Sequence, residues 1–458
     1  MGQHVRTISS CSLRSDTQQL DVGCPFADKI GVMSRVNPKT RDPSTVFTPR
    51  GDTINEMYIA RFGLEDRLRQ YIPQSMHIVL HGESGCGKTW LYKKVFADTS
   101  VYYRTANLGR ACTQGINGLL AEVLAKIDNR QLTEIAETKG AGVNLSLFEA
   151  GLEAQKTYSV RQGDVFELLL QKMRAQAGSK RPAALVFENL EHILNDESAV
   201  NELKGLLLLL DDGDYAKYKI RIVLVTTASN FRTYLSSVGA ANTLINRIKE
   251  VPEVGRLTQS QAETFVKRGL FQLLGIGVSP GDCTQDWLVH QVINFSDRIP
   301  QYMHELCLEI ALTSEASGRT VTRELLTRAV AAWVKGSIVS EITAVTSNLN
   351  SKATKKGRKN QLLYAIALCK DSEFDYVKIE KIVRQEFPAA CEGVKLNVSQ
   401  GLSELADAKI ALIRKNPNGT SYRIVDPRHR ILMRWMLYKE KSSEILSIRD
   451  FDDGVSLS

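Results

Sequence analysis

Residues 81–90, HGESGCGKTW, have the composition and spacing of a loop that binds phosphate. The stretch from Gly82 to Thr89 fits the pattern G-x-x-x-x-G-K-S/T, with an apolar run before it and a helical pattern after it. Glycines let backbone N–H groups turn toward a phosphate, and the positive amino end of the next helix adds to the attraction. We expect Lys88 to reach the β- and γ-phosphates and the Thr89 hydroxyl to bind Mg²⁺. The predicted nucleotide-binding residues here are Gly82, Glu83, Ser84, Gly85, Cys86, Gly87, Lys88, Thr89 and Trp90.

A carboxylate follows the apolar run in AALVFENLEHI. Glu188 at this strand end is a candidate metal residue, together with Thr89, because Mg²⁺ in such sites keeps a water shell held by a carboxylate. The next residue is Asn189, which cannot take a proton from water, so the usual general base is absent. We therefore expect turnover well below the ~10 s⁻¹ typical of enzymes. Glu191 is close in sequence, but a turn that begins at Asn189 would point it elsewhere.

A second apolar strand, RIVLVTTASNF, ends in polar residues. Thr226, Thr227, Ser229 and Asn230 are placed where a side chain could touch a γ-phosphate or an attacking water. Polar strand ends also serve as caps. We favour the sensing role, with Asn230 as a catalytic candidate.

Length, charge and cysteine content limit the class of protein. A chain of 458 residues with 43% hydrophobic and 24% charged residues suggests two to four globular domains. No window reaches the ~20 apolar residues of a membrane helix, and no signal-peptide pattern opens the chain, so we expect a cytoplasmic protein. Eight cysteines without a CxxC pair favour free thiols over disulfides or zinc.

Periodicity along the chain predicts an α/β fold with additional helical parts. Helical and apolar-strand patterns alternate in the first half, which is typical of a parallel sheet with helices on both faces. We expect helices at 55–70, 88–96, 115–127 and 165–176 and strands at 77–81, 101–105, 183–187 and 221–227. The predicted divisions are a polar, flexible arm 1–50, a P-loop core 51–256, an all-helical lid 257–347, a basic linker 348–360, a winged helix-turn-helix 361–445 and a tail 446–458.

The excess positive charge lies in the carboxy-terminal part of the chain. Residues 351–440 contain 18 Lys/Arg and 10 Asp/Glu, which accounts for the whole net charge of +8. This asymmetry suggests weak, sequence-tolerant DNA binding, and a purely internal role for the domain is the alternative. Candidate DNA contacts are Lys355, Lys356, Arg358, Lys359, Lys395, Asn397, Ser399, Gln400, Arg414, Lys415 and Arg423.

Several motifs together resemble the AAA+ and STAND group of P-loop ATPases, with NB-ARC-like features. EMYIARFGLEDRLRQYI resembles the box that frames adenine, which implies a binding role for Arg61. LINRIKEVPEVGRLTQSQ is similar to the passage with the arginine finger, which implies that Arg247 meets the phosphate of a neighbouring subunit. FSDRIPQYMHELCLEIALTSEASGRTVTRELLTRAV resembles the lid motif and implies a nucleotide contact at Pro300. The resemblance implies ATP and Mg²⁺ as cofactors and a nucleotide-dependent oligomer.

Departures from the family pattern affect the expected function. Glu188-Asn189 replaces an acidic pair, and Gln301 replaces the arginine after the lid proline. Arg298, which stands where glycine is usual, could compensate for the missing arginine. These changes favour a switch over a motor.

The leading hypothesis is a slow ATPase that acts as a nucleotide-controlled switch or assembly module. The resemblance points to prokaryotic conflict (antiphage) or regulatory systems, with a separate effector protein and no membrane partner. The alternatives are a DNA-loading ATPase of origin-recognition or transposon type, and a pseudo-ATPase scaffold.

Overall fold

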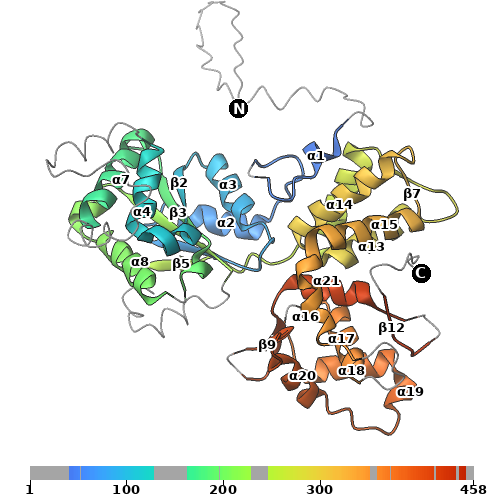
Figure 1. Ribbon diagram of the computed structural model, residues 1–458. Coiled ribbons are helices and arrows are strands. Elements are labelled where there is room, and N and C mark those ends of the chain that lie inside the picture. Colours follow the sequence, from blue (N-terminus) through green and yellow to red (C-terminus); the bar gives the residue numbers. More distant parts are fainter. Residues whose placement is uncertain are drawn as a thin grey trace, which may run out of the picture.

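The computed structural model describes residues 41–51, 53–127, 162–194, 196–227, 246–350, 358–371, 373–416, 419–439 and 443–449. Within these ranges three units follow one another (Figure 1). We name them the P-loop unit (53–250), the helical unit (259–346) and the C-terminal unit (358–449).

The P-loop unit is built on a five-stranded sheet in the order β2-β3-β4-β1-β5, and each pair of neighbouring strands is parallel. The apolar runs of β1, β3 and β4 form its buried centre. This order brings the carboxyl ends of β1, β3 and β4 together, which is where a ligand binds in a parallel sheet. The strands are β1 His77–His81, β2 Tyr102–Asn107, β3 Ala183–Glu188, β4 Ile220–Thr226 and β5 Ile248–Glu250.

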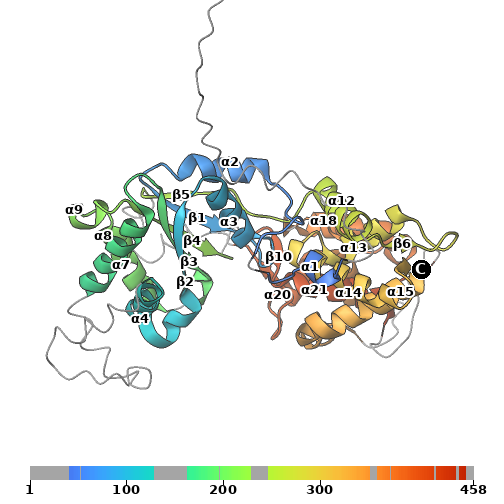
Figure 2. The same cartoon turned by 90° about the horizontal axis from the view of Figure 1, so that it is seen from above.

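Helices cover both faces of this sheet, as the apolar strands predict (Figure 2). The helices α2 and α3 pack on one face, and α4, α7 and α8 pack on the other. The Asp196 side chain caps α8 by accepting a hydrogen bond from the Ala199 N–H at 3.1 Å. The helices and short turns are α2 Phe62–Tyr71, α3 Lys88–Asp98, η2 Leu108–Arg110, α4 Ala111–Ala125, α7 Gln162–Ala177, η3 Leu190–His192, α8 Glu197–Leu209 and α9 Gly213–Ala216.

The helix predicted for residues 55–70 begins seven residues late. Asn55 forms a turn instead, because its side-chain oxygen accepts from the Met57 N–H at 3.0 Å. Its side-chain N–H donates to the Val46 carbonyl at 3.1 Å, which ties the turn to the preceding segment.

The helical unit packs α12 to α16 around one apolar core. The α12 helix begins with a capping box between Thr258 and Gln261. The expectation of an all-helical unit is wrong in one detail, because two short strands pair in parallel. Its elements are α12 Gln259–Val266, π-helix η4 Lys267–Leu273, β6 Gly277–Val278, α13 Gln285–Ser296, α14 Pro300–Glu315, β7 Thr320–Val321, α15 Arg323–Trp333, π-helix η5 Val334–Ile338, η6 Val339–Glu341 and α16 Ile342–Thr346.

The C-terminal unit combines helices with a three-stranded antiparallel sheet in the order β8-β10-β9. Sequence patterns did not predict α21, which packs against α17 of its own unit and against α13 and α16 of the helical unit. The elements are α17 Arg358–Leu368, β8 Glu373–Phe374, α18 Tyr376–Glu386, α19 Pro388–Cys391, α20 Val398–Ala406, β9 Ile413–Lys415, β10 Tyr422–Ile424, α21 Pro427–Met436, β11 Leu437–Tyr438 and β12 Ser447–Ile448.

Three segments that were expected to be loose are packed where the structure describes them. Helix α1, Pro43–Val46, lies against α14, and Phe47 is 1% exposed. In the predicted linker, the buried Asn348 side chain donates to the Ile410 carbonyl at 2.8 Å. In the predicted tail, β12 pairs with β11. Burial of a few apolar or amide groups decides each case, and such burial leaves no periodic pattern in a short segment.

Eight cysteines occur in the sequence, and six of them lie in the described residues. These six cysteines have free thiols. Within the same ranges, no helix has the length and apolarity needed to cross a membrane.

Candidate nucleotide-binding site

The loop between β1 and α3 has the backbone geometry that phosphate binding requires. Gly82 has φ +151°, and a Cβ there would lie 2.3 Å from the Val254 carbonyl oxygen, so a larger residue does not fit. Gly87 has φ +87° and immediately precedes α3. The loop therefore curls so that the amino end of α3 faces its interior.

Lys88 lies inside this curl. Its Nζ donates to the carbonyls of Gly82 at 2.9 Å and Glu83 at 3.0 Å. Burial lowers the pKa of Lys88, and nearby carboxylates oppose that effect. A buried ammonium that has only carbonyl acceptors would gain from an anionic partner.

Thr89 and Glu188 meet as the sequence predicts. Thr89 Oγ1 donates to Glu188 Oε1 at 3.1 Å, and the Tyr92 hydroxyl donates to the same oxygen at 3.0 Å. Among the described residues, no group of three or more His, Cys, Asp or Glu could hold a metal ion. One carboxylate and one hydroxyl suit Mg²⁺, which takes its remaining ligands from phosphate and water.

Asn189 and Glu191 follow the end of β3. Asn189 has a left-handed backbone with φ 60°, and its Nδ2 donates to Asn107 Oδ1 at 2.9 Å. The 3₁₀ turn η3 then brings Glu191 back to the sheet edge, where Oε2 accepts from the Thr227 N–H at 3.1 Å. The expectation that Glu191 points elsewhere is wrong, because the left-handed residue reverses the chain before the turn.

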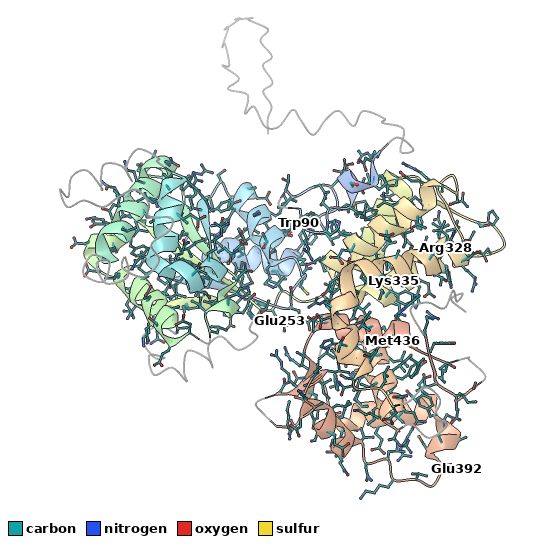
Figure 3. The ribbon with its side chains drawn as sticks, in the orientation of Figure 1. Trp90, Glu253, Arg328, Lys335, Glu392 and Met436 are labelled. Atoms are coloured by element: carbon teal, nitrogen blue, oxygen red, sulfur yellow. The ribbon has the colours of Figure 1, made fainter. Side chains whose placement is uncertain are left out.

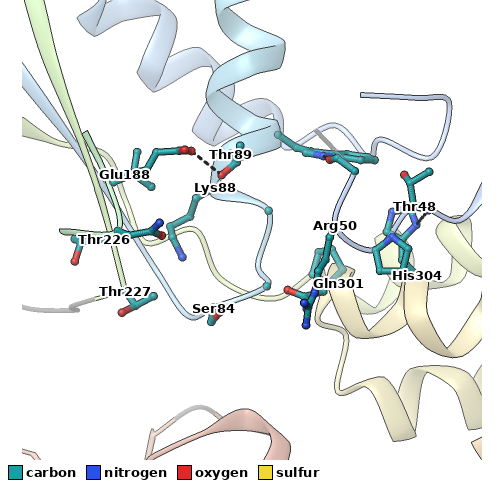
Figure 4. Close-up of a pocket in the computed structure, with 18 of the residues that line it drawn as sticks. Thr48, Arg50, Ser84, Lys88, Thr89, Glu188, Thr226, Thr227, Gln301 and His304 are labelled. Atoms are coloured by element: carbon teal, nitrogen blue, oxygen red, sulfur yellow. Dashed lines mark hydrogen bonds between the residues drawn. The ribbon is translucent and has the colours of Figure 1, made fainter. Parts of the chain in front are cut away.

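These groups surround a cavity of about 290 Å³ (Figure 4). Its walls come from an amino-terminal segment, the phosphate loop, the ends of β3 and β4, and the amino end of α14. The lining residues are Thr48, Pro49, Arg50, Gly51, Ser84, Gly85, Gly87, Lys88, Thr89, Trp90, Glu188, Asn189, Glu191, Val225, Thr226, Thr227, Pro300, Gln301 and His304.

The helical unit closes one side of this cavity. Pro300 is the first residue of α14, and the Gln301 N–H donates to the Gly85 carbonyl at 3.2 Å. The Gln301 side chain donates to Glu305 Oε1 at 3.0 Å. Arg298 does not compensate for the missing arginine, because its guanidinium donates to the Lys370 carbonyl of the C-terminal unit at 3.4 Å.

An aromatic slot of about 30 Å³ adjoins the cavity and shares Trp90 and His304 with it. The Trp90 and His304 rings lie edge to face with centroids 5.4 Å apart. Burial lowers the pKa of His304 to about 3, so the ring is neutral, and its Nδ1 accepts from the Thr48 N–H at 3.1 Å. The slot has room for about one water molecule, so it is too small to hold a nucleotide base.

Arg61 lines this slot but mainly braces the loop. Its guanidinium donates to the carbonyls of Cys86 and Gly255, each at 2.7 Å. The buried Cys86 side chain faces the core. Sequence analysis assigned these residues to binding, whereas their side chains position the backbone that forms the loop.

Glu83 points out of the loop into a chain of buried charges. Its two oxygens accept from Arg256 at 2.9 and 3.2 Å. Arg256 also donates to Asp297, which pairs with Arg430 at 2.9 Å and with Arg434 at 3.0 Å. Burial raises the pKa of the Asp297 carboxyl, but the surrounding arginines outweigh it and hold the pKa below its usual range.

Arg247, a predicted catalytic residue, is not in this cavity. Arg247 precedes β5, at the opposite end of the strands from the phosphate loop, and its side chain pairs with Asp211. It therefore cannot reach the phosphate of its own chain. Asn230 lies outside the described residues.

Sequence reasoning missed the contribution of residues 48–51 and of His304. The available signal was the apolar pair Val46-Phe47 in an otherwise polar stretch, because isolated apolar residues of that kind need a place to be buried.

The comparisons with known proteins agree with this geometry. Residues 73–235 match the family model described as AAA domain. This part of the chain is an AAA+ P-loop ATPase domain. No curated protein matches the sequence.

Three solved structures are similar to the chain at low identity. The Walker-type ATPase of Pyrococcus abyssi is 16% identical, with 85% of this chain and 99% of that chain covered and a TM-score of 0.49. The Aeropyrum pernix ORC1 protein in complex with DNA is 16% identical, with 85% and 95% covered and a TM-score of 0.43. The Thermotoga maritima RuvB Holliday junction branch migration motor is 12% identical, with 82% and 95% covered and a TM-score of 0.40.

Proposed function

We propose that the protein is an ATP-dependent switch, in which nucleotide at the phosphate loop sets the position of the other two units relative to the P-loop unit. The observation that carries this proposal is the chain of charged side chains from Glu83 through Arg256 and Asp297 to α21. It begins in the loop that would hold the phosphates and ends in the C-terminal unit.

The binding half of the proposal rests on the donor groups of the cavity. The loop amides and Lys88 would hold the β- and γ-phosphates. Thr89 and Glu188 would hold Mg²⁺, which supplies charge neutralisation between the phosphates when bound. ATP fits the cavity better than a nucleoside monophosphate, because the cavity extends from the loop to the amino end of α14.

The coupling half follows from the cost of separating buried charges. A loop that tightens on phosphate moves Glu83, and Arg256 moves with it because the two form a bidentate pair. Asp297 is 4% exposed and neutralises the fully buried Arg430. Removing one partner from such a cluster of buried charges costs about 3–5 kcal/mol. The helical and C-terminal units should therefore move together, as one body, when Arg256 moves.

Hydrolysis in this proposal is slow. Asn189 is an amide held by Asn107, so it cannot act as a base. Glu191 is the second carboxylate in the lining of the described cavity, beside Glu188, and a hydrogen bond from the Thr227 N–H fixes its position at the sheet edge. We assign the slow proton transfer to Glu191.

The test is a distance measurement between the outer ends of two units. Fluorophores at Asp214→Cys on α9 and at Glu392→Cys, with Cys11, Cys24 and Cys112 changed to Ser, report the relative position of the P-loop and C-terminal units (Figures 2 and 3). ATP should change the energy transfer in the parent. Lys88→Ala should abolish the change by preventing binding.

Arg256→Met separates binding from coupling. We expect this variant to bind ATP and to show no change in energy transfer. Arg323→Met is the matched control, because Arg323 pairs with Asp282 inside the helical unit and has no contact with the loop. A full change in energy transfer in Arg256→Met would refute the coupling.

DNA binding by the C-terminal unit is a second candidate function. We propose that the order α17, β8, α18, α20, β9, β10 is a winged helix-turn-helix, in which the amino end of α20 and β9 form the contact surface. Exposed polar residues support this role: Lys395, Asn397, Ser399, Gln400, Arg414 and Lys415. Arg423 is paired with Glu373 at 3.3 Å, and Arg358 contacts its own unit, so neither is a strong candidate.

Salt dependence tests this candidate. Affinity for duplex DNA should fall with a log-log slope of about −0.9 per phosphate contacted. Reversing the charges of Arg414 and Lys415 should reduce both the affinity and the slope, whereas the same reversal at Lys378 on α18 should not. An absence of binding at ~50 mM salt would leave the unit with a protein-contact role.

A further inference from the structure

The segment just before residue 52 is fixed to the helical unit by a buried aromatic side chain. Phe47 fills the space over Gly269, where a Cβ would lie 2.4 Å from its ring carbon Cζ. Its ring also packs with those of Phe265 and His304, each at a centroid distance of 6.1 Å. Any side chain at position 269 would displace Phe47, so glycine there is required by the segment.

Two hydrogen bonds then fix the backbone on both sides of Arg50. The Thr48 N–H donates to His304 in α14, and Trp90 Nε1 in α3 donates to the Gly51 carbonyl at 2.7 Å. Arg50 is thereby held where the helical unit meets the phosphate loop. Figure 3 shows Trp90 in this region.

Arg50 presents a cation to the cavity. Its side chain lines the wall on the side of the helical unit, across from Lys88 and Glu188 (Figure 4). Arg50 is exposed, and it has no hydrogen-bond or ion-pair partner among the residues that the structure describes. Apart from Lys88, it is the cation in the lining of this cavity within the described ranges.

The charge balance of the cavity calls for such a cation. Glu188 and Glu191 bring two negative charges to the lining, and Lys88 and Arg50 bring two positive ones. A bound triphosphate adds several more negative charges. From the helical unit, Gln301 is neutral and Arg298 faces the C-terminal unit, so neither supplies a cation.

We propose that Arg50 binds the terminal phosphate of the nucleotide, and that this contact makes the site discriminate between a triphosphate and a diphosphate. This inference rests on the proposed nucleotide site. A guanidinium offers two parallel N–H donors to phosphate oxygens, which suits it to a doubly charged terminal group. Because the segment is bonded to both units, the contact also makes residues 41–51 part of the switch.

The experiment measures the affinity of the full chain for AMP-PNP and for ADP by titration calorimetry with Mg²⁺. We expect Arg50→Ala to weaken AMP-PNP binding by about tenfold or more, equal to about 1.4 kcal/mol, and ADP binding by less than about threefold. Arg50→Lys should fall between the two because it keeps the charge and loses the fork. Arg41→Ala is the matched control, since Arg41 lies on the same segment and pairs with Glu56 away from the cavity.

Two further variants keep the result unambiguous. Gln301→Arg in the Arg50→Ala background should restore the preference for AMP-PNP by supplying a cation from the amino end of α14, in the same cavity lining. Equal loss of AMP-PNP and ADP affinity in Arg50→Ala would overturn the proposal in favour of a structural role. Unchanged affinities, with Lys88→Ala inactive in binding, would also overturn it while leaving the nucleotide site intact. A parent that binds neither nucleotide would refute the proposed function and this inference together.

Discussion

The helical unit has two interfaces of different character. Toward the P-loop unit it meets a cavity of about 290 Å³, where the Gln301 N–H donates to the Gly85 carbonyl of the loop. Arg256, in the connection between the two units, pairs with Glu83 of the same loop. The interface with the C-terminal unit is filled by side chains of α21, in which Arg430, Trp435 and Met436 are buried (Figure 3). The first interface can change when a ligand enters, whereas the second is packed and should move as a block.

The charges at the second interface explain why it can be both polar and rigid. Arg430 donates to the Asp371 carbonyl at 2.8 Å, and Arg434 donates to the Ala367 carbonyl at 2.7 Å. Each arginine therefore satisfies backbone groups of the C-terminal unit and the Asp297 carboxylate of the helical unit. Hydrogen bonds to both units leave these side chains little freedom.

The largest expected effect is at this second interface. Asp297→Asn leaves buried arginines without their counter-charge and should lower the free energy of unfolding by about 3–5 kcal/mol. Urea denaturation would measure it, with Asp282→Asn as the control because the Asp282 side chain is partly exposed. If both variants lose an equally small amount of unfolding free energy, the interface with the C-terminal unit does not depend on its charges, and the contrast drawn between the two interfaces is wrong.

Turnover tests the chemistry at the first interface. Glu191→Gln should reduce the slow ATP hydrolysis by about a hundredfold, since a positioned base contributes about 10²–10⁴-fold. Asn189→Glu should increase hydrolysis above that of the parent. Release of phosphate from purified protein is the measurement. A fast parent enzyme, with Glu188→Gln as the inactivating change, would move the base to Glu188 and argue against a switch.

Ligand stabilisation tests whether the first interface is the nucleotide site. A ligand at a hundred times its Kd should stabilise the folded protein by about 2.7 kcal/mol, seen as a higher melting temperature with ATP and Mg²⁺. Lys88→Ala should remove most of the rise. Lys94→Ala on the same helix is the control, because Lys94 pairs with Asp98 outside the cavity. An undiminished rise in Lys88→Ala would exclude the loop as the binding site.

Acid stability tests the buried position of His304 at the first interface. Burial lowers the pKa of His304 to about 3, below its value of about 6.5 in the unfolded chain. The unfolded state therefore binds the proton first, and stability should fall as the pH decreases from about 6.5 toward 3, by up to about 1.4 kcal/mol per unit. His304→Asn keeps an acceptor for the Thr48 N–H and should show a shallower slope. An unchanged slope would mean that His304 is protonated at little cost.

Local patterns were sufficient to predict the centre of the molecule. The strand at 77–81, the helix that begins at Lys88 and the strand that ends at Glu188 were predicted within one or two residues. Backbone propensity, apolar runs and glycine spacing act over a few residues, so one sequence contains the whole signal. The same locality explains why Glu191 was misjudged, since its direction depends on one left-handed residue at Asn189.

The sequence by itself determined that a phosphate loop, a hydroxyl and a carboxylate would meet at one edge of a parallel sheet. Only the tertiary structure decided what faces them. Thr48 and His304 are bonded across 256 residues, and Asp297 and Arg430 across 133. Such contacts form because burying Phe47 lowers the free energy of the fold, and because a charge that is buried without a partner would raise it. Those gains depend on which distant surfaces come together, and no local spacing in the chain specifies them.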